Sequence, residues 1–229
     1  MTAGLSPCHV KVLMMKDLNK YIDHTILKAE ATEADIRKLC AEAKQYGFYA
    51  VCVNSCYVAL AKKELESSDV RIASVIGFPL GAAHTAAKVA ETEIAVSEGA
   101  DEIDMVIHVG ALKEGRLEYV LADIKAVTEA ARRGGAIVKV ILETCLLTDE
   151  EIVTACKLSQ KAGAAFVKTS TGFSSAGATS EHVRLMKNTA GDSLEVKASG
   201  GIRDRSKALE MIEAGADRIG ASASVAICS

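Results

Sequence analysis

The sequence is poor in aromatic residues, proline and charge of one sign. It contains no Trp and only two Pro, and aromatic residues make up 4% of its 229 positions. Few rings can stack on single-stranded bases, and a net charge of −3 gives no broad attraction to nucleic acid or anionic lipid. No apolar run approaches the ~20 residues that a membrane-spanning helix needs. We therefore expect neither nucleic acid nor membrane as a partner.

The cysteine and histidine residues form no recognisable framework. The seven Cys are irregularly spaced without a CxxC pair, and the five His are scattered. This pattern argues against a disulfide scaffold and against a zinc site. The N-terminal stretch also lacks the apolar core of a signal peptide. We expect a cytoplasmic protein without a metal ion or other cofactor.

The length and the hydrophobic content indicate one globular domain. Hydrophobic residues make up 49% and charged residues 25% of the chain, which is ordinary for a folded protein. No linker or low-complexity stretch divides the sequence. We predict a short N-terminal extension over residues 1–15 and a single domain over residues 16–229.

Eight short apolar runs, rich in Val and Ile, alternate with amphipathic stretches. Continuous apolar runs of this length are typical of strands buried on both faces. The predicted strands are Tyr21–Asp23, Tyr49–Val53, Ile72–Ile76, Glu102–Ile107, Ile137–Leu142, Ala165–Thr169, Glu195–Ala198 and Asp217–Ala221.

The stretches between these runs carry signals of helix ends. Thr32 with Asp35 and Thr148 with Glu151 have the spacing of a capping box, and Ser180 is predicted to open another helix. A glycine in the left-handed conformation is expected just after these helices, at positions 47, 99, 134, 163, 191 and 215.

Eight strand–helix units in a chain of this length favour an α/β fold of the (β/α)8 TIM barrel type. An open, doubly wound sheet is the alternative. That alternative predicts a GxGxxG turn after an early strand, and none is present.

Charged residues interrupt four of the predicted strands. Glu102 and Asp104 alternate on one strand, while Lys139, Lys168 and Lys197 lie inside apolar strands and are spaced 29 residues apart. One strand–helix unit per step would place the three lysines at equivalent depths. The structural alternative is that one or two of these lysines lie at strand mouths and form structural salt bridges with Glu102 or Glu143.

Lysines and a carboxylate in an apolar barrel favour imine chemistry. A free lysine amine has a pKa of ~10.4, which apolar walls and a second cation lower. The neutral amine can attack a carbonyl group and form a Schiff base, and a carboxylate such as Asp104 can relay protons. These residues predict carbon–carbon bond cleavage or formation without a metal ion.

Glycine and hydroxyl residues follow the last three predicted strands. These segments include Thr171 and Gly172, then Gly200 and Gly201, and finally Gly220 and Ser222. Loops after strands 7 and 8 of such barrels often bind phosphate through backbone N–H groups. We expect a phosphorylated small molecule as the substrate.

Eight motifs together resemble the deoxyribose-phosphate aldolase family over residues 16–227. They are YIDHT (21–25), VCVN (51–54), IGFPLG (76–81), EIDMV (102–106), KVILET (139–144), FVKTSTGF (166–173), VKASGGIR (196–203) and RIGAS (218–222). The resemblance implies a class I aldolase that reversibly cleaves 2-deoxy-D-ribose 5-phosphate to acetaldehyde and D-glyceraldehyde 3-phosphate, in deoxyribose phosphate catabolism.

The resemblance also implies roles for individual residues. Lys168 matches the Schiff-base lysine, Lys197 the second lysine that assists proton transfer, and Asp104 the carboxylate of the proton relay. Asp23, Cys52 and Lys139 match supporting positions, and the glycine and serine loops match the phosphate site. The family also implies a homo-oligomer, most simply a dimer.

Two positions depart from the family pattern. Some relatives carry a lysine where this chain has Phe173, and many carry a glycine where it has Ser224. Phosphate binding is therefore expected to depend more on the backbone and on Ser222. Three alternatives stay open: a different Schiff-base aldolase, a phosphometabolite-binding barrel without activity, and a metal-dependent aldolase, which the scattered His disfavour.

Overall fold

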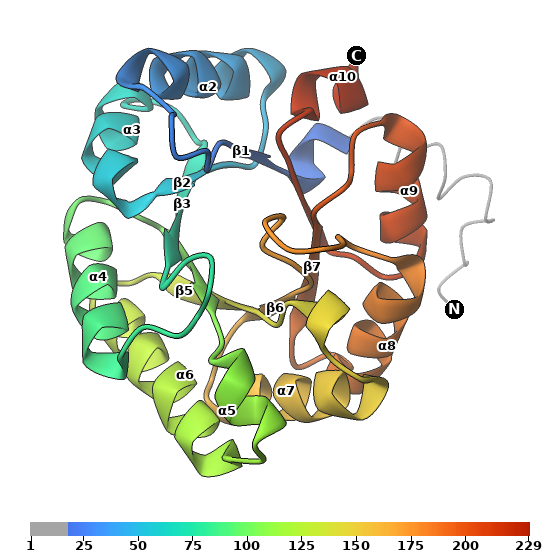
Figure 1. Cartoon of the computed structure of the whole chain (residues 1–229). Helices are drawn as coiled ribbons and strands as arrows, with labels where there is room; N and C mark the ends of the chain where they lie inside the picture. The colour runs from blue at the N-terminus through green and yellow to red at the C-terminus, as the bar shows by residue number, and fades with distance from the viewer. Residues whose placement is uncertain (1–17) are drawn as a thin grey trace, which may run out of the picture.

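Eight parallel strands close into a barrel surrounded by helices (Figure 1). A computed structural model describes residues 18–229, so the predicted extension over 1–15 and its boundary at residue 16 lie outside the described residues. Each strand pairs with the next, and β8 returns to pair with β1 through Ile22 and Ile219. This closure confirms the (β/α)8 barrel and excludes the open sheet.

All eight predicted strands are present within one or two residues of their expected ends. They are β1 (Ile22–Thr25), β2 (Ala50–Asn54), β3 (Arg71–Ile76), β4 (Glu102–Val106), β5 (Ile137–Ile141), β6 (Phe166–Lys168), β7 (Glu195–Ser199) and β8 (Arg218–Ala221). Because parallel strands point the same way, all their carboxyl ends meet at one face of the barrel.

Helices form the outer ring. They are α2 (Glu33–Tyr46), α3 (Val58–Glu64), α4 (Thr85–Ser97), α5 (Val109–Lys113), α6 (Leu117–Arg133), α7 (Asp149–Lys161), α8 (Ser180–Ala190), α9 (Arg205–Glu213) and α10 (Ser224–Cys228), with short 3-10 turns η1 (Leu18–Tyr21), η2 (Ser55–Tyr57) and η3 (Thr144–Leu146). The last helix, α10, packs near α2 and so completes the ring (Figure 1).

The predicted helix ends are mostly confirmed. Thr32 and Thr148 form capping boxes with Asp35 and Glu151. The cap of α8 is Thr179, one residue before the predicted Ser180, because its hydroxyl accepts the N–H of His182. Gly134 was also wrongly assigned: its φ is −101°, and the left-handed position falls on Gly135 with a φ of 84°.

The barrel separates an apolar outer core from a largely charged interior. Val and Ile side chains of the strands pack outward against the helices in one continuous cluster. Inside the barrel, a small apolar cluster consists of Leu27, Cys52, Ala73 and Val75, with Phe78 packed against it, and the ring of Phe166 lies beside Lys139 and Arg218. The remaining interior space is therefore available for ionic side chains.

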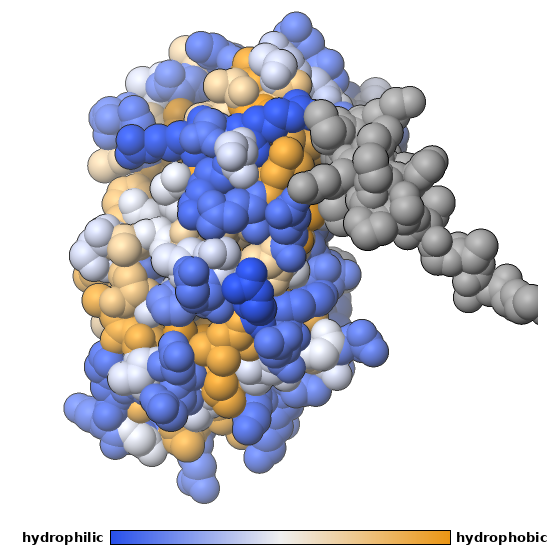
Figure 2. All heavy atoms as spheres, turned by 90° about the vertical axis from the view of Figure 1, so that its right-hand side faces the viewer, coloured by the Kyte–Doolittle hydropathy of each residue, from blue (hydrophilic) through white to orange (hydrophobic). Residues whose placement is uncertain are grey.

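One face of the molecule is mainly polar. On the face in Figure 2, hydrophilic side chains are interrupted by smaller hydrophobic patches. Among residues 18–229, no helix has both the length and the apolar character to cross a membrane.

Candidate active site

Seven charged side chains are buried within the barrel. They comprise three carboxylates and four cations: Asp23, Glu102, Asp104, Lys139, Lys168, Lys197 and Arg218. Burying a charge is costly unless a partner of opposite charge and hydrogen bonds compensate for the lost water. The seven side chains meet this requirement by forming one connected network.

Asp104 is the centre of this network. Its Oδ1 atom lies 2.7 Å from Nζ of Lys139, and its Oδ2 atom lies 3.0 Å from Nζ of Lys168 and 2.8 Å from Nζ of Lys197. Burial alone would raise the pKa of Asp104, but the three lysines outweigh it and hold that pKa well below its ordinary value. Asp104 is therefore ionised and accepts a hydrogen bond from all three predicted lysines.

The strand register explains how the lysines converge. Lys168 and Lys197 are paired positions on β6 and β7, as predicted. Lys139 pairs instead with Asp104 on β4, and Ile141 takes the position beside Lys168. The prediction of equal depth is wrong for Lys139, because strands in a closed barrel are staggered and equal spacing in sequence does not fix equal height.

Asp23 joins the network across the seam between β1 and β8. It forms an ion pair with Lys197 and accepts a hydrogen bond from Nη1 of Arg218 at 3.0 Å. Burial acts to raise the pKa of Asp23, yet Lys197, Lys139 and Arg218 lower it to about 2. Asp23 thus stays charged and holds Lys197 from the side away from Lys168.

Arg218 and Glu102 complete the base of the network, and neither was singled out as a site residue. Glu102 lies 2.5 Å from Lys139 and 3.2 Å from Arg218. The guanidinium group of Arg218 also stacks 3.5 Å from the ring centre of Tyr49. The predicted structural ion pair therefore exists for Lys139 and Glu102.

Glu143 does not pair with a strand lysine, which corrects that part of the structural alternative. Its carboxylate instead accepts hydrogen bonds from the backbone N–H and the hydroxyl of Thr171. Glu143 is buried and holds a left-handed backbone conformation, with φ 58° and ψ 60°. Such a conformation is costly for a residue other than glycine and is often kept at functional sites.

Cys52 lies in the same interior. Its sulfur atom is 4.0 Å from Oδ2 of Asp104. Burial raises the pKa of the Cys52 thiol, so the side chain is a neutral neighbour of the charged network.

A pocket of about 300 Å³ opens at the carboxyl ends of the strands. Lys168 lies in its wall, and six further predicted residues line it: Thr171, Gly172, Gly200, Gly201, Gly220 and Ser222. Asp104, Lys197, Asp23, Lys139 and Cys52 do not line the pocket and lie buried within the barrel. Lys168 is thus the one network residue in contact with the pocket.

Two cations in this wall, Lys28 and Arg203, were missed as site residues. They follow β1 and β7, and both line the pocket. Their place in the sequence could have indicated them, because each lies in the loop after a predicted strand, at the face where such barrels bind ligands.

The glycine-rich loops are held by close backbone contacts. A side chain at Gly177 would place its Cβ atom 2.1 Å from the carbonyl oxygen of Gly200. Gly220 lies within β8, and a Cβ atom there would be 3.0 Å from Cε of Lys197. Glycine at 177 therefore lets two loops meet, and glycine at 220 leaves room for Lys197.

The two positions that depart from the family pattern lie in different surroundings. Phe173 lines the pocket and contacts Phe78 edge to face, with ring centres 5.2 Å apart. Ser224 is buried, and its hydroxyl donates to the carbonyl of Ala221 at 2.8 Å. Ser224 is therefore the buried first residue of the short helix α10 and does not line the pocket.

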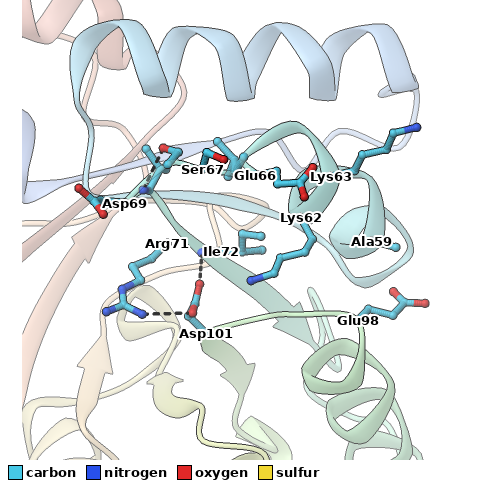
Figure 3. Close-up of a pocket in the computed structure, with 13 residues that line it drawn as sticks. Ala59, Lys62, Lys63, Glu66, Ser67, Asp69, Arg71, Ile72, Glu98 and Asp101 are labelled. Carbon is cyan, nitrogen blue, oxygen red and sulfur yellow. Dashed lines mark hydrogen bonds and ion pairs between the residues drawn. The ribbon is translucent and has the colours of Figure 1, made fainter.

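A larger hollow, of about 920 Å³, lies at the opposite end of the barrel near the start of β3 (Figure 3). Charged residues of both signs surround it, including Lys62, Arg71 and Asp101, and Arg71 pairs with Asp101 at 3.2 Å. It contains none of the predicted site residues. We place the candidate site in the smaller pocket because Lys168 of the charged network lines it.

Known proteins similar to this chain share both its sequence and its fold. A family model described as DeoC/LacD family aldolase matches residues 18–229. A deoxyribose-phosphate aldolase from Finegoldia magna is 59% identical over 211 residues, covering 92% of this chain and 98% of the relative. One from Streptococcus suis is 60% identical over 210 residues, covering 92% of this chain and 94% of the relative.

A solved structure agrees with these sequence relatives. The deoxyribose phosphate aldolase of Aeropyrum pernix, described as tetrameric, superposes with a TM-score of 0.88 at 37% identity, covering 93% of this chain and 90% of the other. The family match, the relatives and the barrel all point the same way. The chain is therefore an aldolase that belongs to the DeoC/LacD family.

Proposed function

We propose that the protein is a class I aldolase that reversibly cleaves 2-deoxy-D-ribose 5-phosphate through a Schiff base on Lys168. The observation that carries this proposal is the contact between Lys168 and Asp104, made where the charged network meets the pocket. The relatives from Finegoldia magna and Streptococcus suis are named for this substrate and support its assignment.

The first half of the reaction forms the imine. The neutral amine of Lys168 attacks C1 of the open-chain sugar, and the resulting carbinolamine loses water to give a protonated imine. The water leaves with a proton that Lys197 donates or Asp104 relays. The positive imine nitrogen then remains beside the Asp104 carboxylate, which stabilises it.

The second half breaks the C2–C3 bond. The C3 hydroxyl gives up its proton, its oxygen becomes the aldehyde of glyceraldehyde 3-phosphate, and the bonding electrons move through C2 to the imine nitrogen as an enamine. C2 then takes a proton, and water releases acetaldehyde and the free amine. No oxidant, reductant or metal ion is needed for this balance.

The interior of the barrel holds one more cation than carboxylates. Three carboxylates face four cations, so the interior balances when one cation gives up its proton. Burial lowers the pKa of Lys197, but Asp104 and Asp23 outweigh it and raise that pKa above its ordinary value. Lys197 therefore holds its proton at the start of the reaction, when the amine of Lys168 attacks.

The phosphate group is proposed to bind where the loops after β6, β7 and β8 meet. Gly172, Gly200, Gly201 and Ser222 line this part of the pocket. Backbone N–H groups of such loops and a serine hydroxyl are suited to phosphate oxygens.

The proposal extends to assembly and location. We propose a homo-oligomer, on the basis of the tetramer described for the Aeropyrum pernix relative. We also propose the cytoplasm, because the six cysteines within residues 18–229 are free. Light scattering in solution tests the assembly.

The direct test of the reaction is cleavage by the purified protein. The unchanged chain should release acetaldehyde and glyceraldehyde 3-phosphate from 2-deoxy-D-ribose 5-phosphate, and borohydride added with substrate should inactivate it. Lys168→Ala should have no measurable cleavage. Near-normal cleavage by Lys168→Ala would overturn the mechanism.

A further inference from the structure

The pocket is lined by cations without any carboxylate. Lys28, Lys168 and Arg203 contribute the only charged side chains among its lining residues. Lys168 forms an ion pair with Asp104, whereas Lys28 and Arg203 are exposed at the mouth of the pocket. Within the described part of the chain, no carboxylate lies within 4 Å of either of these two cations. Asp35 lies near enough for its charge to interact with that of Lys28, but it does not line the pocket, so the lining of the mouth itself is positive.

Lys28 projects from a well-defined backbone. The N–H of Ile26 donates to the carbonyl of Cys52 at 3.1 Å, and the N–H of Ala31 donates to the carbonyl of Lys28 at 3.1 Å. The capped start of α2 follows directly at Thr32. Because both sides of the β1–α2 loop are anchored, the stem of Lys28 has a fixed starting point.

Lys28 lies on the side of the glycine loops away from Phe173. In the order of the barrel, β7 and β8 separate β6 from β1, and their loops carry Gly200, Gly201 and Ser222. On the β6 side, Phe173 offers no charge, and its ring is occupied by Phe78. Lys168 on β6 is already paired with Asp104, and Arg203 follows β7, so Lys28 is the lysine of the pocket lining that is left to meet a doubly charged group, from the β1 side.

We infer that Lys28 is a specificity-determining residue whose ammonium group binds the phosphate of the substrate from the β1 side of the glycine loops. This inference rests on the proposed function and adds to it the side chain that recognises the charged end of the sugar. In this role the ammonium group contacts the phosphate and takes no part in imine formation between Lys168 and C1 of the sugar. Its contribution should appear in substrate binding and leave the chemical step unchanged.

The test compares phosphorylated with unphosphorylated 2-deoxy-D-ribose. A hydrogen bond to a charged group is worth about 1.5–3 kcal/mol, so Lys28→Gln should raise KM for the phosphorylated sugar about tenfold to a hundredfold. Its kcat, and its kcat/KM for the unphosphorylated sugar, should stay near those of the unchanged protein. Lys28→Arg should restore most of the lost binding, since it keeps the charge.

Two further measurements separate recognition from a general surface effect. Lys62→Gln removes an equally exposed lysine from the hollow at the opposite end of the barrel (Figure 3) and should change no kinetic constant. Phe173→Lys added to Lys28→Gln places a cation on the β6 side. This double variant should have a lower KM for the phosphorylated sugar than Lys28→Gln alone.

The inference is overturned if Lys28→Gln leaves KM for the phosphorylated sugar unchanged. It is equally overturned if KM rises by the same factor for both sugars, because the lysine would then act on the shape of the pocket. Failure of the proposed function looks different. In that case the unchanged protein cleaves neither sugar and forms no borohydride adduct.

Discussion

Lys168 and Lys197 are register partners on β6 and β7, and their ammonium groups contact the same oxygen atom, Oδ2 of Asp104, at 3.0 and 2.8 Å. Two cations on one oxygen repel each other, and loss of one proton relieves that repulsion. Lys197 has Asp23 as a second counter-charge. We therefore assign the retained proton to Lys197 and the reacting amine to Lys168.

Asp104→Asn should damage both activity and stability. The change removes the charge that three buried lysines share. Loss of the proton relay should lower kcat by about 10²–10⁴-fold. Leaving buried cations unpaired should lower the free energy of unfolding by about 3–5 kcal/mol. Steady-state kinetics and urea denaturation measure the two effects.

Glu102→Gln is the matched control for that variant. Glu102 pairs with Lys139 and Arg218 below the pocket, and it has no contact with Lys168. Glu102→Gln should lower the free energy of unfolding to a similar degree. It should retain far more of the original kcat than Asp104→Asn does. Equal losses of kcat in both variants would argue that Asp104 acts only through folding.

Stability should fall steeply in acid. The pKa of Asp23 in the folded protein is lowered to about 2, while an unfolded Asp has a pKa of ~3.9. A lowered carboxyl pKa contributes stability that is present above the unfolded value and is lost as the pH falls through the folded value. Asp23 alone should account for about 2–3 kcal/mol, lost mostly between about pH 4 and 2.

Denaturant unfolding at a series of pH values from 6 to 2 checks this dependence. Asp104, whose pKa is also held well below its ordinary value, should add to this loss. In Asp23→Asn, the loss of free energy of unfolding between pH 6 and pH 2 should be smaller by the contribution of Asp23. A free energy of unfolding that stays constant from pH 5 to pH 2 would contradict the ionised network.

Gly220→Ala should displace Lys197 while the barrel stays folded. The added Cβ atom would lie 3.0 Å from Cε of Lys197 and 3.1 Å from Cβ of Ser199. Overpacking of this kind costs about 1–3 kcal/mol of stability. A shift of the ammonium group of even ~1 Å should lower kcat by up to about 10²-fold. Kinetics and a thermal unfolding curve check both effects.

Gly110→Ala is the control for Gly220→Ala. Gly110 lies in helix α5, and an added Cβ atom would meet only the ring of His108, at an ordinary distance of 3.5 Å. Its kcat should stay unchanged. If Gly220→Ala also kept its full kcat, glycine at 220 would not be needed to position Lys197.

The sequence predicted the barrel well because the strand signal is local. Each apolar run between two helix signals identifies one strand, and all eight appear where expected. The error at Gly134 has a local cause too, since two glycines follow the end of α6 at Arg133 and the second of them, Gly135, adopts the left-handed conformation. The sequence pattern does not tell which of two adjacent glycines adopts the left-handed conformation.

The site was predictable only in part, because its contacts depend on barrel closure. Lys168, Lys197 and Asp104 stand out as charges within apolar strands, and the structure brings them together. Arg218 reaches Asp23 only because β8 pairs with β1, which joins residues 195 positions apart. Glu143 likewise depends on a loop contact that no spacing in the sequence specifies.

The measurement that tests the central claim most directly is mass spectrometry of the protein after reduction with borohydride in the presence of acetaldehyde. Peptide mapping should find an N-ethyl group on Lys168, because only that lysine of the network lines the pocket. The Lys168→Ala variant should carry no such adduct. An N-ethyl group on Lys197 or Lys139 in the active, unchanged protein, with Lys168 unmodified, would contradict the account.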